Sequence, residues 1–188
     1  MKPVHVFLLV PLVCAAFVFS AAQQQPSSAE GWRQTQQTDA VRGAYTRYSL
    51  TGKFLKTPPG DPANRPSLVV DCSSKNRSGK PKFVRGNLVV GDPLKIDWVE
   101  PEEIHGTSYF PKVSVVYRLN EGKQEKEEWT PSTDKRSASF AKGSLEKMLR
   151  AHDVEITATD DRGSQIAMQF DMPDPTPVEQ GCDVDHKK

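Results

Sequence analysis

The chain carries almost no net charge and few strongly hydrophobic residues. Its 25 Lys and Arg nearly balance 24 Asp and Glu, so the formal charge of the 188 residues is +1. A near-neutral charge excludes a strongly polyanion-binding domain, and a mean hydropathy of −0.58 excludes a polytopic membrane protein. No collagen-like or coiled-coil pattern is present in the sequence. The composition is therefore that of a globular protein, and we expect no nucleic-acid partner.

The one long apolar run lies at the N-terminus. Lys2 precedes an apolar stretch that ends near Phe19, and small residues at 20–22 form a cleavage site. This arrangement predicts a secretory signal peptide over residues 1–22, because the run is short for a membrane span. We expect an exported protein, periplasmic or extracellular, with no transmembrane span after signal cleavage. The alternative is an uncleaved N-terminal anchor.

Cysteine is scarce, and the mature chain has a lean core. Fewer than one in five of its residues is Leu, Ile, Val or Phe. Cys14 leaves with the signal peptide, and the bulky Val13 before it argues against lipid attachment. The remaining pair, Cys72 and Cys182, favours a disulfide in an exported chain. Such a bridge closes a loop of roughly 110 residues, which contributes about 4–5 kcal/mol in the chain-entropy model. Metal binding or a nucleophilic cysteine would need neighbouring ligands or a base that the spacing does not supply.

Short runs of alternating hydrophobicity predict β-strands in a single domain. Residues 23–38 are polar and predict a flexible leader, residues 39–182 the domain, and residues 183–188 a charged tail. Residues 113–119 alternate most clearly, and Asn120 to Lys123 then provide hairpin chemistry. Seven or eight such strands indicate a mainly β protein, an antiparallel β-sandwich.

Two further segments near the C-terminus have definite patterns. Leu145, Met148 and Leu149 recur at helical spacing, which predicts one short helix near residues 143–152 with Ser144 as its N-cap. Val154, Ile156 and Ala158 match Ile166, Met168 and Phe170 across the turn at residues 160–163. We therefore predict a second hairpin there.

No catalytic motif stands out, and no cofactor or metal site is expected. His105 and Glu102 supply only two ligands, which do not make a metal site. A partly buried histidine at the helix end accounts for His152, and a tight hairpin accounts for Asp160 and Asp161. The alternative is a glycan-directed hydrolase that uses the loop carboxylates with a histidine. Those carboxylates are Glu102 and Glu103, or Asp160 and Asp161.

One loop concentrates positive charge. Its five basic residues lie within eleven positions that contain no acid: Lys75, Arg77, Lys80, Lys82 and Arg85. They form either a solvated loop or a site for an anionic ligand such as a phosphorylated glycan. Asn76 begins a glycosylation sequon, whose use depends on the host.

The tryptophans are expected to contribute to the core. Trp98 is in phase with Leu94 and Ile96, which places it inside, and Trp129 is expected to anchor the edge of the core. Exposed aromatic rings would instead be able to stack on sugars.

Several of these residues together resemble the TagO-like envelope proteins associated with bacterial type VI secretion, and related uncharacterised secreted proteins. The matching positions, scattered between Pro66 and Cys182, are Cys72 after Leu68-Val69-Val70, then residues 115–120, Trp129, Ser132, Asp134, Phe140, Phe170-Asp171 and Cys182. The resemblance implies a β-sandwich, an exported location, paired cysteines and an accessory, non-enzymatic role.

These observations predict an exported, non-catalytic binding or accessory scaffold module of the bacterial cell envelope. Its partner would be an envelope protein or an anionic glycan. The alternatives are the glycan-directed hydrolase and a small-ligand carrier, which would show an enclosed apolar cavity.

Overall fold

The computed structural model describes residues 31–41, 43–56, 64–73, 83–99, 109–182 and 184. The signal-peptide prediction and most of the basic loop lie outside these residues. The strands are β1 (Arg33–Asp39), β2 (Gly43–Thr51), β3 (Lys53–Phe54), β4 (Ser67–Ser73), β5 (Val84–Val89), β6 (Asp97–Val99), β7 (Phe110–Leu119), β8 (Gln124–Pro131), β9 (Ser137–Phe140), β10 (Asp153–Thr159) and β11 (Gln165–Asp171); the helices are α1 (Lys142–Leu149) and α2 (Thr176–Cys182). In this part of the chain, no helix has the length and apolar character needed to cross a membrane.

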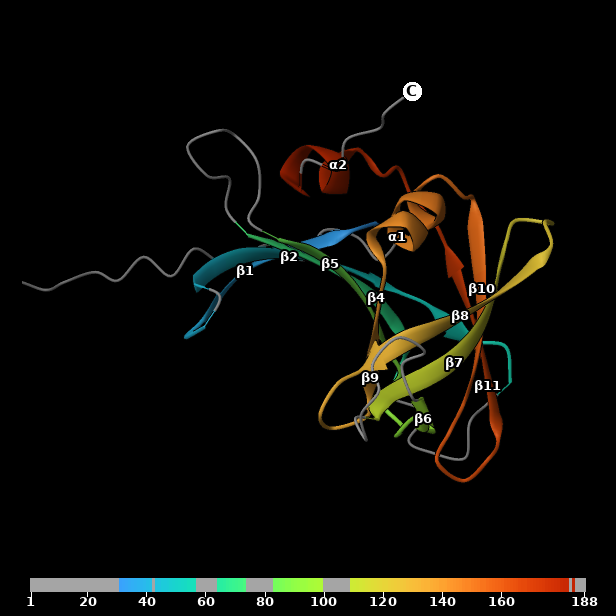
Figure 1. The fold of residues 1–188 in the computed structure, drawn as a ribbon. Helices are drawn as coiled ribbons and strands as arrows, with labels where there is room; N and C mark the ends of the chain where they lie inside the picture. Colours follow the sequence, from blue (N-terminus) through green and yellow to red (C-terminus); the bar gives the residue numbers. More distant parts are fainter. Residues whose placement is uncertain are drawn as a thin grey trace, which may run out of the picture.

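The strands form one strongly curled antiparallel sheet (Figure 1). Its order is β1-β2-β4-β5-β9-β8-β7-β10-β11-β3, with β6 paired to β7. The mainly β, antiparallel prediction is confirmed, but the architecture is a curled half-barrel with more strands than the seven or eight expected of a sandwich. The additional strands include the polar strand β1 at one end of the order and the two-residue strand β3 at the other, while β6 pairs with β7 off this path.

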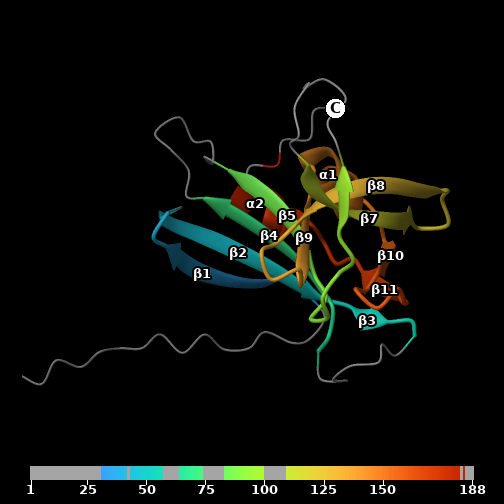
Figure 2. The same cartoon turned by 60° about the horizontal axis from the view of Figure 1, so that its bottom comes forward.

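A single bent stretch of chain links β2, the second strand of the order, to β3 at its far end. Gly52 alone separates β2, which pairs with β4, from β3, which pairs with β11. Figure 2 shows β3 lying beside β11. A Cβ at Gly52 would lie 2.5 Å from the Phe170 ring and 2.7 Å from the Gln169 carbonyl oxygen. Glycine is therefore required for the close approach that lets the chain leave one half of the sheet and enter the other.

The sheet begins earlier than the expected domain start at residue 39. Strand β1 pairs along its whole length with β2, from Arg33 opposite Ser49 to Asp39 opposite Gly43. Part of the segment expected to be a flexible leader is therefore an edge strand. Its sequence is polar and mostly exposed, so it carries no hydrophobic signal.

Inward-facing side chains of both halves of the sheet form one core, which includes buried Val113, Val115 and Tyr117. Both predicted hairpins are confirmed. Strands β7 and β8 are joined by the turn after Leu119, and β10 pairs with β11 in the expected register, with Ile156 opposite Met168. Alternation with period two therefore identified the central strands correctly.

Helix α1 covers one end of the core and buries its apolar face, as the helical spacing predicted. The prediction that Ser144 is the N-cap was wrong. The N-cap is Ala141, without a side-chain cap bond, and Ser144 is buried inside the helix. Its Oγ donates to Glu127 of β8 at 2.7 Å. An acidic acceptor on a neighbouring strand thus replaces the helix's own backbone as the serine's partner.

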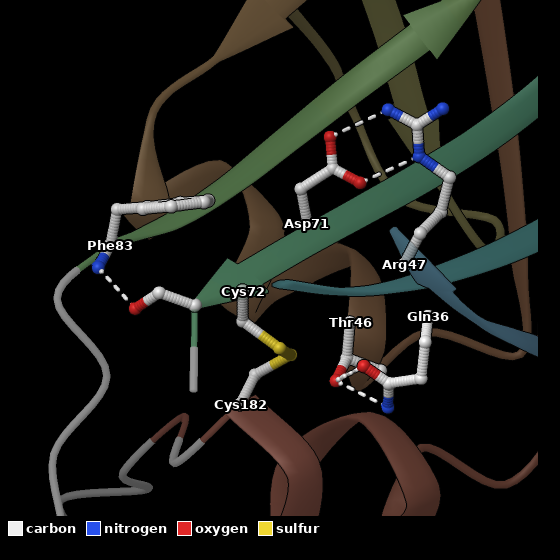
Figure 3. The surroundings of a disulfide bond; sticks show 8 residues. Gln36, Thr46, Arg47, Asp71, Cys72, Phe83 and Cys182 are labelled. Atoms are coloured by element: carbon white, nitrogen blue, oxygen red, sulfur yellow. Dashed lines mark hydrogen bonds and ion pairs between the residues drawn. A yellow bond between two sulfur atoms is a disulfide. The ribbon is translucent and has the colours of Figure 1, made fainter. Parts of the chain in front are cut away.

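The predicted disulfide is confirmed and fastens α2 to the sheet. Cys72 of β4 and Cys182 of α2 are bonded, with Cα atoms 5.3 Å apart (Figure 3). Val178 and Cys182 of α2 are both buried. This C-terminal helix was not predicted, because seven residues with a proline provide too little periodic pattern.

The prediction that Trp98 lies in the core was wrong. Leu94 is fully buried, but Trp98 is 65% exposed. The alternation does not continue because Leu94 belongs to an isolated bridge with Asp160, whereas Trp98 lies on β6, which pairs with β7. Trp129 is buried as expected, with its ring centroid 4.8 Å from that of Phe140.

Candidate functional site: a polar groove on the outer face of the sheet

An open groove of about 590 Å³ lies on the outer face of the sheet. Its floor comes from β2, β4, β5 and β9, and the turn after β8 forms one wall. The residues that define its chemistry are Arg47, Asp71, Arg85, Asn87, Ser137 and Ser139. This volume falls within the range of small-molecule sites.

Strand register brings these residues together from distant parts of the sequence. Arg47 lies opposite Asp71, which in turn lies opposite Arg85, so the three form a row across β2, β4 and β5. In the next row, Asn87 lies between Val69 and Ser139. Because successive side chains alternate between faces, Asp71 and Cys72 point to opposite sides of β4, as Figure 3 shows.

Arg47 and Asp71 form a two-point ion pair at the centre of the groove (Figure 3). The Nε–Oδ1 distance is 2.7 Å and the Nη2–Oδ2 distance is 2.9 Å. The Asp71 side chain is only 2% exposed, whereas that of Arg47 is 38% exposed. The hydrogen bond that Arg47 donates to Asp71 raises the pKa of Arg47, so this guanidinium stays charged.

The Tyr45 ring supports the same guanidinium, with its centroid 5.8 Å from Arg47 Cζ. Tyr45 is itself buried and contacts the Phe83 ring at 6.2 Å. Arg47 is thus held by a carboxylate and an aromatic ring, which fixes the position of its charge in the groove.

The remaining polar groups of the groove differ in how they are bonded. Ser139 Oγ donates to Asn87 Oδ1 at 2.6 Å. This bond occupies the amide oxygen of Asn87 and does not involve its NH2 group. Arg85 is exposed and makes no ion pair with any residue that the structure describes. Between these groups, Val69 and Val89 form a small apolar part of the floor.

The turn after β8 forms a fixed wall. Ser132 Oγ lies 2.5 Å from Asp134 Oδ1, and the backbone N–H of Ser137 donates to Ser132 Oγ at 3.1 Å. The hydrogen bond from Ser132 lowers the pKa of Asp134, together with the backbone N–H of Arg136. These contacts hold the turn, including Thr133, beside the open floor.

The groove offers side chains rather than free backbone. Strands β2, β4, β5 and β9 each have a hydrogen-bonded neighbour on both sides. A ligand on this face therefore meets hydroxyl, amide and guanidinium groups, and an extended peptide cannot add to the sheet there as a further strand.

Of the five predicted basic residues, the structure places Arg85 in the groove. Lys75, Arg77, Lys80 and Lys82, together with the sequon at Asn76, lie outside the described residues. The groove itself was not predicted, because Arg47, Asp71 and Ser139 meet only through strand pairing.

The candidate catalytic carboxylates divide into two groups. Glu102, Glu103 and His105 lie outside the described residues. Asp160 is fully buried and accepts backbone N–H groups of Arg162 and Ser164 at 3.0 and 2.7 Å.

Although burial alone would raise the pKa of Asp160, its hydrogen bonds with Ser164 and Arg162 lower it overall. Asp160 thus fixes the β10–β11 turn, as a hairpin interpretation predicts. His152 is exposed rather than partly buried. Among the described residues, no group of three or more His, Cys, Asp or Glu is arranged to hold a metal ion.

A second polar cluster lies beneath α1 and was missed at the level of sequence. Glu127 accepts hydrogen bonds from Tyr117 Oη at 2.7 Å, Trp129 Nε1 at 3.0 Å and Ser144 Oγ at 2.7 Å. The signal was present in β8, where Glu125, Glu127 and Trp129 share one face of the strand. This cluster ties the helix to β7 and β8.

The chain matches no protein-family model, and no curated protein or solved structure is similar to it at a significant level.

Proposed function

We propose that this protein is an exported, non-catalytic binding module of the bacterial cell envelope, and that the outer-face groove holds a glycan. The predicted signal peptide and the disulfide support export, because disulfides persist in oxidising compartments. The resemblance to TagO-like proteins agrees with an accessory role without catalysis.

The observation that carries this proposal is the lining of the groove. Side-chain hydroxyls, an amide and arginines surround a small apolar floor at Val69 and Val89. Sugars present the same combination of hydroxyl edges and apolar ring faces. The match between these groups favours a glycan over a purely apolar ligand.

The hydrolase alternative has weaker support within the groove. A glycosidase needs two carboxylates on either side of the bond that it cleaves. Asp71 is the single carboxylate that lines the described groove, and both of its oxygens accept hydrogen bonds from Arg47. A small-ligand carrier would need an enclosed cavity, whereas this groove is open.

A groove-filling substitution tests the proposal. Ser137 lines the groove, so Ser137→Trp places a large ring inside it. Thr157→Trp, which places the same ring on the outer face of β10, is the control. Oligosaccharides released from bacterial envelopes are titrated by calorimetry. We expect Ser137→Trp to abolish binding and Thr157→Trp to leave it unchanged. Failure of the wild-type protein to bind any oligosaccharide would overturn the proposal.

A further inference from the structure

We infer that the groove selects a glycan bearing an oxyanion, either a carboxylate or a phosphate monoester. This inference rests on the proposed function and specifies the ligand class. It is carried by an imbalance between hydrogen-bond donors and acceptors in the two central rows of the groove.

The one carboxylate among the described residues that line the groove is not available to a ligand. Each Asp71 oxygen accepts from Arg47, and the Asp71 side chain is 2% exposed. It therefore cannot offer a free negative charge to a bound molecule. Arg47, in contrast, remains 38% exposed, and Figure 3 shows one of its terminal nitrogens outside the pair. The ion pair thus presents a donor to the groove and hides the acceptors.

Arg85 adds a charge that this pair does not neutralise. It lies directly opposite Asp71 on β5, yet the two-point pair of Asp71 is formed with Arg47. Two arginines and one aspartate leave a net positive charge in the row. A guanidinium fork binds carboxylates and phosphates at two points, which suits an oxyanion better than a neutral hydroxyl.

Asn87 extends the donor-rich surface along β5. It is two residues from Arg85 on the same face of the strand, and Ser139 already occupies its amide oxygen. Its NH2 group is therefore the part of the amide that remains to bind a ligand. Arg85 would hold the oxyanion, while Asn87 and the serines of β9 would bind neighbouring sugar oxygens.

The carboxylates of an acidic peptide would also form ion pairs with the arginines, but the groove favours a glycan. Peptides commonly bind β-sheets by adding a strand to a free edge. The strands beneath the groove have no free edge, and the available contacts are hydroxyl and amide side chains that complement sugar oxygens.

The test compares three tetrasaccharides by calorimetry at low and moderate salt: one of uronic acids, one carrying a phosphate monoester and one neutral. We expect an acidic tetrasaccharide to bind about tenfold or more tightly than the neutral one, as for hydrogen bonds to charged groups. This preference should weaken as salt increases. Comparison of the two acidic compounds distinguishes carboxylate from phosphate recognition, and preference for either one supports the inference.

Arg85→Gln should remove the preference for the acidic compounds over the neutral one. Because Arg85 is exposed, its loss should not unfold the sheet. Lys123→Gln, in the turn between β7 and β8, makes the same charge change away from the groove and should have no effect. Arg85→Lys should restore part of the preference, since it returns the charge without the fork.

The possible failures are distinguishable. If the neutral tetrasaccharide binds as tightly as the acidic ones, or Arg85→Gln keeps the preference, the inference is overturned and the proposed function stands. If an acidic peptide binds and no tetrasaccharide does, both are overturned.

Discussion

Glu127 shows how one residue can connect a helix to the sheet. Its carboxylate accepts hydrogen bonds from a tyrosine, a tryptophan and a serine that belong to β7, β8 and α1. All three donors come from buried residues. Burial alone would raise the pKa of Glu127, but the hydrogen bonds outweigh it and lower the pKa overall. The carboxylate is therefore stabilised in its charged form.

This lowered pKa makes stability depend on pH. In the unfolded chain the pKa of Glu127 is near its ordinary value of 4.5, and in the folded protein this pKa is lower. The stabilising effect of the charged carboxylate is therefore fully present above about pH 4.5. The effect is lost as the pH falls through the folded pKa. We expect Glu127→Gln to flatten this acidic part of the profile, measured by urea unfolding at several pH values. Glu128→Gln, on the exposed face of β8, is the control. An unchanged acidic slope in Glu127→Gln would contradict this account.

Gly86 is a residue at which shape rather than charge matters. It lies opposite Phe140 on the neighbouring strand, and a Cβ there would collide with the Phe140 ring. We expect Gly86→Ala to lower the free energy of unfolding by about 1–3 kcal/mol through overpacking.

The double variant Gly86→Ala/Phe140→Leu should lose less stability than the sum of its single variants, because a smaller side chain relieves the collision. Urea unfolding of all four proteins provides the measurement. Additive losses would show that the ring does not limit this position.

At the level of elements, the disulfide determines how firmly α2 is held. Cys182→Ser should lower the free energy of unfolding by about 2–5 kcal/mol under oxidising conditions. Thermal or urea unfolding checks this, and the reduced wild-type protein serves as the reference for the lost crosslink. An equal midpoint for wild type and variant under oxidising conditions would mean that the bridge contributes nothing to stability.

Elements differ in how well the sequence predicts them. The β10–β11 hairpin was predictable because its apolar alternation and its turn at Asp160–Gly163 are both local. Strand β1 was not, since its Gln and Thr residues bury little. The N-cap prediction for Ser144 failed because a serine near a helix start suggests a cap, whereas the residue that accepts its hydrogen bond, Glu127, lies on β8. Local patterns therefore identify elements better than they identify their partners.

At the level of the whole molecule, the groove depends on the strand order. Arg47, Asp71, Arg85 and Ser139 come from four strands that become neighbours only when the sheet forms by strand pairing. Arg85 could be identified as a candidate from its place in a basic stretch of the sequence. Nothing in the sequence, however, indicated that Asp71 would be buried beside Arg47. A site composed from long-range pairing has no spacing motif, so sequence reasoning alone could not locate it.

The bend at Gly52 also has a kinetic consequence. Phe54 pairs with Met168 of β11, the last strand in the sequence, so this part of the sheet cannot form until that strand has been synthesised. Contacts between such distant residues require a large loop to close, at a cost in entropy, before the contacts contribute favourable energy. This slows folding to the millisecond-to-second range. A nascent chain of this protein would therefore stay open until late in its synthesis, which would suit the export that we propose.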